Sequence, residues 1–286
     1  NKSKPKIKSR YIKWIKIDLL KENEIKKLLK NNNFKYVIQC AATTAGVQSM
    51  KSDPFSFISG NAIMNSLLIK WCVHFKVEHF IFLSCTVMYR NSKTYLKETQ
   101  FNIEKYIHPS YEGIAFTKVY LENICKFYAE RSVTKFTALR HSNVYGPYDK
   151  FNNSKGHFMS SIITKTFKKN KSLEIWGDGS EKRDFLYIDD FLDGINLLFS
   201  RQKKNFEIFN MSSGKSYSLK KIVKKIVKIT NKRKKIIYLK NKPTIKINIL
   251  VNNKKIFNKI GWKPKTSIDK GIKETINWYQ EFYNQR

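Results

Sequence analysis

The hydrophobic and polar positions of this 286-residue chain follow two different periods. Short apolar runs at residues 36–42, 80–84 and 135–140 are typical of strands that are buried on both faces of a sheet. The segment 11–19 alternates between apolar and polar side chains, which predicts a further strand. Helical spacing is found over residues 22–30, 54–76 and 111–131. Strands that alternate with helices in this way predict a parallel α/β sheet.

The pattern changes after Gly146-Pro147. A polar stretch at residues 149–156 comes first. It precedes helices that we predict over 158–169 and 189–200, with a glycine-containing turn at 177–179 between them. A helix, a strand and a final helix that ends near Trp278-Tyr279 complete the chain. The length and the order of these elements indicate one large domain or two closely joined lobes.

The chain carries 56 Lys and Arg against 22 Asp and Glu, a formal net charge of +34. Such a balance is found in proteins that bind polyanions, but it also arises where Lys, Asn and Ile are used heavily throughout a sequence. The lysines are spread over the chain, and no nucleic-acid-binding motif accompanies them. We therefore expect no nucleic-acid partner, although the positive field can still attract an anionic substrate.

The four cysteines, Cys40, Cys72, Cys85 and Cys125, have neither CxxC spacing nor a complementary pair of histidines. We therefore expect no zinc or other metal site, and reduced, mostly buried thiols favour a cytoplasmic protein. No apolar run reaches the roughly 18 residues that a membrane helix needs, so no membrane partner is expected. The first residues are not followed by the apolar core of a secretory signal.

Several short segments, taken together, resemble a known family. They are Asp18-Leu19, Ala41-Ala42, Asn61, 82–89, Lys118, 143–147, 176–179, 183–190 and 261–266. Their order and spacing are similar to those of extended short-chain dehydrogenases of the NAD-dependent epimerase/dehydratase family. The GDP-L-fucose synthase-like branch of nucleotide-sugar epimerases and reductases fits best. Each segment alone is common, but the ordered set is specific to the family.

The resemblance implies a Rossmann-type doubly wound parallel sheet with a smaller α/β substrate lobe. The cofactor domain would span residues 1–145 together with about 184–212, and the nucleotide-sugar lobe residues 146–183 and 213–286. The implied cofactor is NADP or NAD, the substrate a nucleotide sugar, and the activity reduction or epimerisation of a 4-keto sugar. A homodimer would form through helices that match 56–75 and 111–131. The alternative is a non-catalytic homologue that keeps the fold for sugar-nucleotide binding or assembly.

The cofactor residues that the resemblance implies follow predicted strands, beyond whose carboxyl ends open α/β sheets bind ligands. Asp18, followed by Leu19, would accept a hydrogen bond from the adenine amino group, or it is a solvated carboxylate at a strand end. Ala41 and Ala42 would let the dinucleotide approach the backbone, or they serve ordinary packing. Asn61 would support the network around the active-site lysine, or it is a surface residue.

Lys118 matches the lysine that in this family binds the nicotinamide ribose and lowers the pKa of a tyrosine four residues earlier, on the same helix face. That earlier position holds Ile114, which cannot donate a proton. Tyr111 lies seven residues before Lys118, about 10.5 Å away along a regular helix. It becomes the candidate acid if the helix begins only after Gly113 and Tyr111 swings inward from a loop.

The position of the family's catalytic Ser or Thr, four residues before Tyr89, holds Cys85. A thiol is a poor hydrogen-bond partner for a sugar hydroxyl or keto oxygen. Thr86 could serve instead if the backbone turns at the strand end, because side chains alternate in direction along a strand. His157 matches an acid/base of epimerisation in GDP-L-fucose synthase-like enzymes, whereas Val87 occupies the position of its partner cysteine.

The substrate-binding residues that the resemblance implies are Asn143, His157, Trp176 and Arg183. The guanidinium fork of Arg183 suits diphosphate oxygens. His157 alternatively does no more than cap the helix that it begins. The family often has a second Arg in the region that matches 244–253, and this chain has none there.

The family begins with a strand, a G-x-x-G-x-x-G turn and a helix, in a βαβ unit of ~30 residues whose backbone and helix N-terminus bind the pyrophosphate. None of the 11 glycines of this sequence belongs to such a motif. We therefore expect a sheet that lacks its first βα unit and a chain that is a fragment or the product of a decayed or split gene. Impaired NAD(P) binding is the expected consequence.

Overall fold

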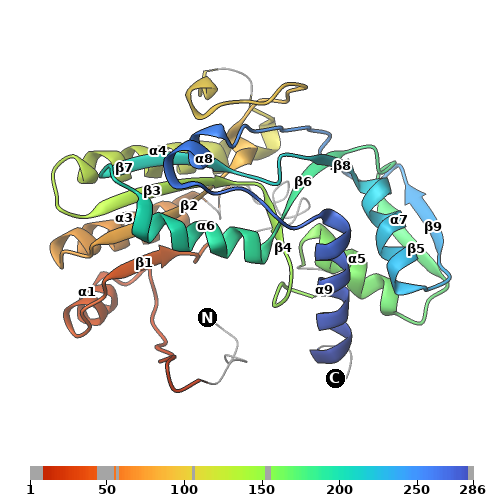
Figure 1. Ribbon diagram of the computed structural model, residues 1–286, viewed down its shortest axis with the longest axis horizontal. Coiled ribbons are helices and arrows are strands. Elements are labelled where there is room, and N and C mark those ends of the chain that lie inside the picture. The colour runs from red at the N-terminus through yellow and green to blue at the C-terminus, as the bar shows by residue number, and fades with distance from the viewer. Residues whose placement is uncertain (1–8, 44–54, 56–57, 105–106, 152–155, 283–286) are drawn as a thin grey trace.

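The larger sheet consists of four parallel strands in the order β1-β2-β3-β7 (Figure 1). The computed structural model describes residues 9–43, 55, 58–104, 107–151 and 156–282. The strands are β1 (Tyr36–Gln39), β2 (His79–Cys85), β3 (Lys135–His141), β4 (Asn143–Tyr145), β5 (Ser172–Trp176), β6 (Lys182–Tyr187), β7 (Phe206–Met211), β8 (Ser216–Ser218) and β9 (Lys235–Leu239). The helices are α1 (Glu22–Lys30), α3 (Ile58–His74), α4 (Glu112–Ala129), α5 (Phe158–Phe167), α6 (Ile188–Arg201), α7 (Leu219–Thr230), α8 (Lys254–Ile260) and α9 (Ile268–Phe282). Three short 3₁₀ turns are η1 (Thr86–Met88), η2 (Glu98–Gln100) and η3 (Pro109–Tyr111).

Strand β2 lies inside the sheet and is buried on both faces. Phe80 and Phe82 belong to a core that includes residues of α1, α3 and α4. Ile81, between them, belongs to a second core that includes residues of α6 and α8. Because successive side chains point to opposite faces of a strand, an uninterrupted apolar run requires cover on both sides. The doubly wound parallel α/β architecture expected from the sequence is therefore confirmed.

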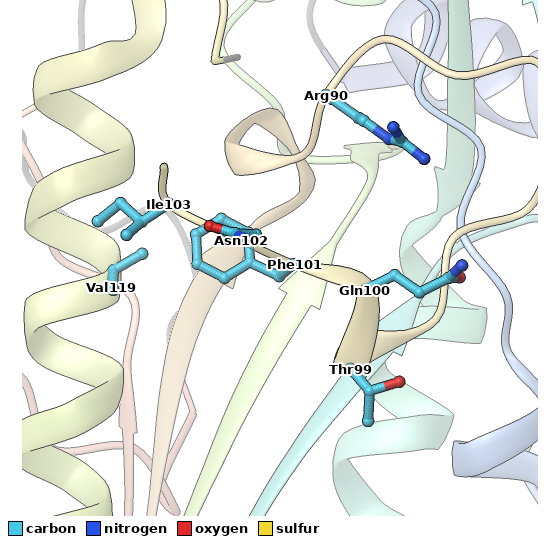
Figure 2. Close-up of a pocket in the computed structure, with 7 residues that line it drawn as sticks. All are labelled: Arg90, Thr99, Gln100, Phe101, Asn102, Ile103 and Val119. Atoms are coloured by element: carbon cyan, nitrogen blue, oxygen red, sulfur yellow. The ribbon is translucent and has the colours of Figure 1, made fainter. Parts of the chain in front are cut away.

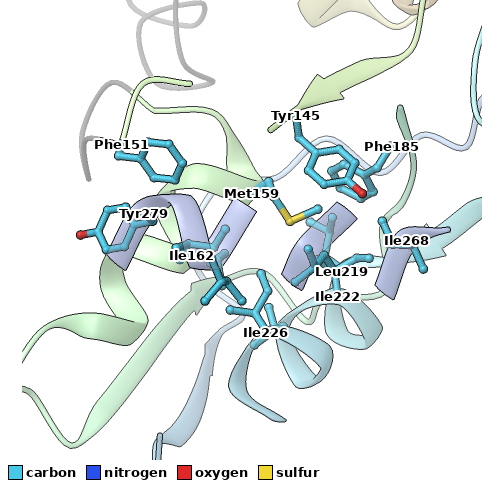
Figure 3. Close-up of a cluster of buried hydrophobic side chains, with 14 of the residues drawn as sticks. Tyr145, Phe151, Met159, Ile162, Phe185, Leu219, Ile222, Ile226, Ile268 and Tyr279 are labelled. Atoms are coloured by element: carbon cyan, nitrogen blue, oxygen red, sulfur yellow. The ribbon is translucent and has the colours of Figure 1, made fainter. Parts of the chain in front are cut away.

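The smaller lobe has a core of its own, shown in Figure 3. The parallel pair β5-β9 and the three-stranded sheet β4-β6-β8 supply its strands. Helix α7 is amphipathic: Ile222 and Ile226 are buried, and the Ser218 side chain caps the helix by accepting a hydrogen bond from the Lys221 amide. Ile272 of α9 packs in the same core. Three helices, α5, α7 and α9, thus share one apolar interior.

Residues 11–19 do not form the predicted strand. They lie in an irregular segment before α1. Most of their side chains are exposed, that of Tyr11 by 81%, whereas Ile17 and Leu19 are partly buried. Within the described ranges β1 pairs only with β2, and no strand pairs with 11–19. An alternating sequence forms a strand where a neighbouring chain takes up its backbone hydrogen bonds, and no described segment provides that neighbour.

Candidate functional site

Lys118 of α4 lies at the carboxyl end of β2. Its Nζ atom donates a hydrogen bond of 2.5 Å to the carbonyl oxygen of Leu83 and lies 4.6 Å from the centre of the Phe82 ring. Burial lowers the pKa of Lys118, while Cys85 and Glu122 act in the opposite direction. The structure therefore brings the predicted lysine to the end of the strand that carries Cys85.

Cys85 is the last residue of β2, and the chain turns at once into η1, which begins with Thr86. The turn that would free Thr86 from strict strand alternation is therefore present. Burial raises the pKa of the Cys85 thiol, and nearby Lys118 opposes this effect. A thiol that stays protonated is a poor nucleophile, so we expect Cys85 to line the site rather than to attack a substrate.

His141 ends β3 directly beside Cys85, and the sequence patterns do not single it out. The two residues are paired in the parallel register of β2 and β3. Nδ1 of His141 lies 2.8 Å from the carbonyl oxygen of Ser142, and its ring makes an edge contact with Phe191 at 5.5 Å between ring centres. The available sequence signal was a polar residue at the end of an apolar strand, immediately before the 143–147 motif.

A buried polar network fixes α4 against the strands. Arg140 of β3 donates to both carboxylate oxygens of Glu122 on α4, at 3.0 and 2.6 Å. Ser84 of β2 donates to the same carboxylate at 2.6 Å. Arg140 also donates to the Tyr89 hydroxyl at 2.8 Å, and that hydroxyl donates to Asn210 of β7 at 2.7 Å. Since α4 carries Lys118, this network sets where its ammonium group lies.

Asn61 of α3 holds the segment that follows β1. Its side-chain oxygen accepts from the Thr43 amide at 2.9 Å, and its side-chain nitrogen donates to the Thr43 carbonyl at 3.0 Å. Ala41 donates its amide to the Gln39 side chain at 3.1 Å, and both Ala41 and Ala42 are exposed. The side-chain nitrogen of Gln39 is buried and has no hydrogen-bond partner among the residues that the structure describes. Asn61 therefore shapes the loop on which the predicted alanines lie.

Asp18 does not end a strand. The prediction of a strand over 11–19, on which its adenine contact was based, is therefore wrong. Asp18 is exposed, and its Oδ1 atom accepts a hydrogen bond from the Leu20 amide at 3.0 Å. Its own amide donates to Glu24 of α1 at 2.7 Å. Leu19 packs partly against the core around α1, α3 and α4. The observed role of this pair is to shape the turn into α1, and the adenine contact stays a prediction.

Tyr111 and Arg183 meet across the two lobes, although they lie 72 residues apart. Nη1 of Arg183 on β6 donates to the Tyr111 hydroxyl at 3.4 Å. Tyr111 is buried and immediately precedes α4, which begins at Glu112. The helix therefore starts before Gly113, and the condition for Tyr111 to swing inward from a loop is wrong. Its hydroxyl instead faces the guanidinium group that was predicted to bind diphosphate.

His157 begins α5, as predicted, and its side chain faces the polar segment before that helix. Nδ1 lies 3.2 Å from Oδ1 of Asp149, and the His157 side chain is largely exposed. The hydrogen bond to Asp149 raises the pKa of His157. In return, hydrogen bonding to His157 lowers the pKa of Asp149 against the effect of its burial. The His157 imidazole is therefore bonded to a carboxylate that favours its protonated form.

Asn143 and Trp176 lie in two different sheets, β4-β6-β8 and β5-β9. The Asn143 side chain donates to the Asp184 carbonyl at 2.9 Å, which ties β4 to β6. Trp176 ends β5 and is partly exposed, at 39%. The turn after it requires Gly177 and Gly179, whose φ angles are 78° and 71°, a conformation that side chains disfavour. These positions agree with the predicted turn.

A pocket of about 510 Å³ opens between α4 and the loop that follows β2 (Figure 2). It is lined by Arg90, Thr99, Gln100, Phe101, Asn102, Ile103 and Val119. Figure 2 shows Ile103 and Val119 together on one side and Arg90 with Gln100 on the other. None of the predicted site residues lines this pocket. The candidate site therefore rests on the carboxyl ends of β1, β2 and β3.

A doubly wound parallel sheet with candidate ligand-binding residues at the carboxyl ends of its strands is the arrangement of the Rossmann-type class of proteins. The chain belongs to the NAD-dependent epimerase/dehydratase family, whose sequence model matches residues 1–212. It is 27% identical over 271 residues to the GDP-L-fucose synthase of Sinorhizobium fredii, covering 93% of this chain and 85% of that protein. It is 26% identical over 269 residues to the GDP-L-colitose synthase of Yersinia pseudotuberculosis, covering 92% and 87%.

Two solved structures show the same fold. The UDP-glucose 4-epimerase of Thermotoga maritima with UDP-glucose has a TM-score of 0.82 and 24% identity, over 93% of this chain and 83% of that chain. The GDP-L-fucose synthetase of Naegleria fowleri bound to NADP has a TM-score of 0.81 and 23% identity, over 93% and 82%. The predicted family is thus confirmed. The lack of a first βα unit and the domain boundaries stay predictions.

Within the described residues no helix is both long and apolar enough to cross a membrane.

Proposed function

We propose that this chain is an NAD(P)-dependent nucleotide-sugar reductase or epimerase that acts on a GDP-linked 4-keto sugar. The observation that carries the proposal is Lys118, whose ammonium group is held at the carboxyl end of β2 beside Cys85. Open α/β sheets bind their ligands at this edge. The choice of a GDP-linked sugar is supported by the names of the two relatives, which match 93% and 92% of the chain.

Residues at the ends of β1 and β2 fit a dinucleotide cofactor. The buried side-chain nitrogen of Gln39 has no partner in the described part of the chain, and a buried donor of this kind needs an acceptor. Exposed Ala41 and Ala42 leave the backbone after β1 open to a ligand. Lys118 would hold the ribose hydroxyls, and Asn61 would keep the loop after β1 in place. When bound, the cofactor supplies or accepts the hydride.

The sugar oxygen would lie near Lys118 and the end of β2. Negative charge that develops on this oxygen would be stabilised by the ammonium group of Lys118, which is held at the carboxyl end of β2. Thr86 would donate a hydrogen bond to the same oxygen, because a hydroxyl is a stronger donor than the Cys85 thiol. His157, whose pKa is raised by Asp149, would hold the proton that epimerisation requires.

The nucleotide would bind along the smaller lobe. Arg183 would bind the diphosphate, and the Tyr111 hydroxyl would fix the orientation of its guanidinium group. Trp176 offers a partly exposed aromatic ring at the end of β5. Asn143 would line the sugar side of the site, close to β6, to which its side chain is bonded. These roles separate substrate binding from the chemistry at Lys118.

The proposal is tested by NADPH oxidation in the presence of a GDP-linked 4-keto sugar, with the cofactor at millimolar concentration. Replacement of Lys118 by Met should lower kcat by about 10²-fold or more. The matched control is Lys126→Met, because Lys126 lies on the same helix and its side chain is exposed. Equal turnover by Lys118→Met and the wild type would refute the assignment.

We further propose that the protein is a cytoplasmic homodimer. Exposed apolar side chains on α3 and α4 support the dimer: Ile63, Phe116, Tyr120 and Phe127. The four free cysteines support a reducing compartment. Sedimentation equilibrium should give twice the chain mass, and Phe116→Glu should give a folded monomer. A monomeric wild type at micromolar concentration would contradict the proposed dimer.

A further inference from the structure

His141 lies beside the residues to which the proposed reaction is assigned. Its Cα pairs with that of Cys85 in the register of β2 and β3, so both side chains occur at the same edge of the sheet. The positive charges of Lys118 on α4 and of His157 at the start of α5 both lower the pKa of His141. His141 therefore lies at the carboxyl end of β3, next to the end of β2 where Lys118 is held.

The proton of the His141 ring can be assigned from its partner. Nδ1 lies 2.8 Å from the carbonyl oxygen of Ser142. A carbonyl oxygen only accepts hydrogen bonds, so Nδ1 carries the hydrogen, and in the neutral ring Nε2 carries a lone pair. The edge contact with Phe191 further fixes the ring. Nε2 makes no hydrogen bond to any residue in the described ranges.

The His141 ring is neutral at physiological pH. Burial lowers its pKa to about 4, and the positive charges of Lys118 and His157 act in the same direction. The hydrogen bond to Ser142 acts in the opposite direction but does not overcome burial. The side chain is nevertheless only half-buried, so a ligand at the strand ends can reach it.

We propose that Nε2 of His141 is a ligand-binding acceptor that takes a hydrogen bond from an O–H or N–H group at the reaction centre. This inference rests on the proposed function. The donor is either a sugar hydroxyl or the carboxamide of the nicotinamide ring. If the donor is the sugar, the site distinguishes the alcohol from the ketone, because a keto oxygen has no hydrogen to donate. His141 would then favour the reduced sugar over its keto form.

The test is ¹⁵N NMR of the histidine side chains at neutral pH, with GDP-fucose and NADP⁺ added in separate titrations. The free protein should show His141 with an unprotonated Nε2. One of the two ligands should move that resonance, and the ligand that does so identifies the donor. Nε2 protonation in the free protein, or an unmoved resonance while calorimetry shows ligand binding, would overturn the inference and leave the proposed function intact. Binding of neither ligand would overturn both.

Variants give a second readout. Loss of one hydrogen bond in His141→Phe should raise the Kd of the identified ligand about 2- to 10-fold. His141→Gln should restore most of the affinity, because its amide oxygen can replace the Nε2 acceptor. The control is His74→Phe, since His74 is exposed in the last turn of α3. Equal affinities of His141→Phe and the wild type would overturn the inference.

Discussion

Glu122 of α4 and Arg140 of β3 form an ion pair that is removed from solvent, with 2.6 Å between Oε2 and Nη2 and 4% exposure of each side chain. Ser84 and Tyr89 complete its hydrogen bonds. Because α4 also carries Lys118, the pair fixes the helix that positions the ammonium group. The site's geometry therefore depends on a contact that takes no part in the chemistry.

Replacement of Glu122 by Gln should reduce the free energy of unfolding by about 3 to 5 kcal/mol, since it leaves the Arg140 guanidinium buried without a counter-charge. Urea denaturation followed by circular dichroism measures this change. The control is Glu130→Gln, because Glu130 forms only solvent-exposed ion pairs, which contribute little. Similar losses of unfolding free energy in both variants would show that the buried ion pair stabilises the protein no more than the exposed ones.

Gly271 of α9 packs where no side chain fits. A Cβ atom there would lie 2.2 Å from the Tyr145 hydroxyl and 3.0 Å from Cδ2 of Tyr187. Gly271→Ala should therefore destabilise the protein by about 1 to 3 kcal/mol through overpacking. Gly60→Ala on α3 is the control, because among the described residues its Cβ would meet only Thr43 Oγ1, at 3.9 Å. A neutral Gly271→Ala would contradict the packing of α9.

The pKa of His157 should fall toward its ordinary value when Asp149 is replaced by Asn. Since the folded-state pKa is raised, the pair stabilises the protein at pH values below the unfolded pKa of roughly 6.5. That contribution is lost as pH rises through the folded pKa. NMR titration of His157 measures the change, with His79, whose pKa burial lowers to about 4, as the internal reference. An unchanged pKa of His157 in Asp149→Asn would exclude the hydrogen bond between the two side chains.

Tyr111→Phe separates two roles of this residue. If Tyr111 orients Arg183, the variant should raise KM for the nucleotide sugar about 2- to 10-fold and leave kcat nearly unchanged. If Tyr111 is the proton donor, kcat should fall by about 10²-fold or more. The hydrogen bond between Arg183 and the Tyr111 hydroxyl favours the first outcome. Steady-state kinetics with the GDP-linked sugar as the variable substrate distinguishes them.

The inner strands could be predicted because each is a short apolar run with helices on both sides. β1, β2 and β3 lie where the runs at 36–42, 80–84 and 135–140 place them. The segment 11–19 has an equally good strand pattern, yet it forms none. The pattern of one segment does not reveal whether a partner is present to accept its backbone hydrogen bonds. β7, at Phe206–Met211, was missed although it completes the sheet.

Motif positions name single candidate residues of the site, but they do not give the arrangement of those residues. Lys118 and Cys85 follow from motif positions, and the structure brings them together. The contact between Tyr111 and Arg183, and the pairing of Cys85 with His141, depend on how separate elements meet. Strand register is set by tertiary packing, so short motifs cannot supply it.

The most direct test of the central assignment is hydride transfer itself. The protein is incubated with a GDP-linked 4-keto sugar and NADPH that carries deuterium at C4 in either the pro-R or the pro-S position. Mass spectrometry of the sugar product should show one deuterium from one of the two labelled cofactors, and Lys118→Met should abolish this signal. A wild-type protein that binds both ligands but neither transfers label from either cofactor nor epimerises the sugar would contradict the account.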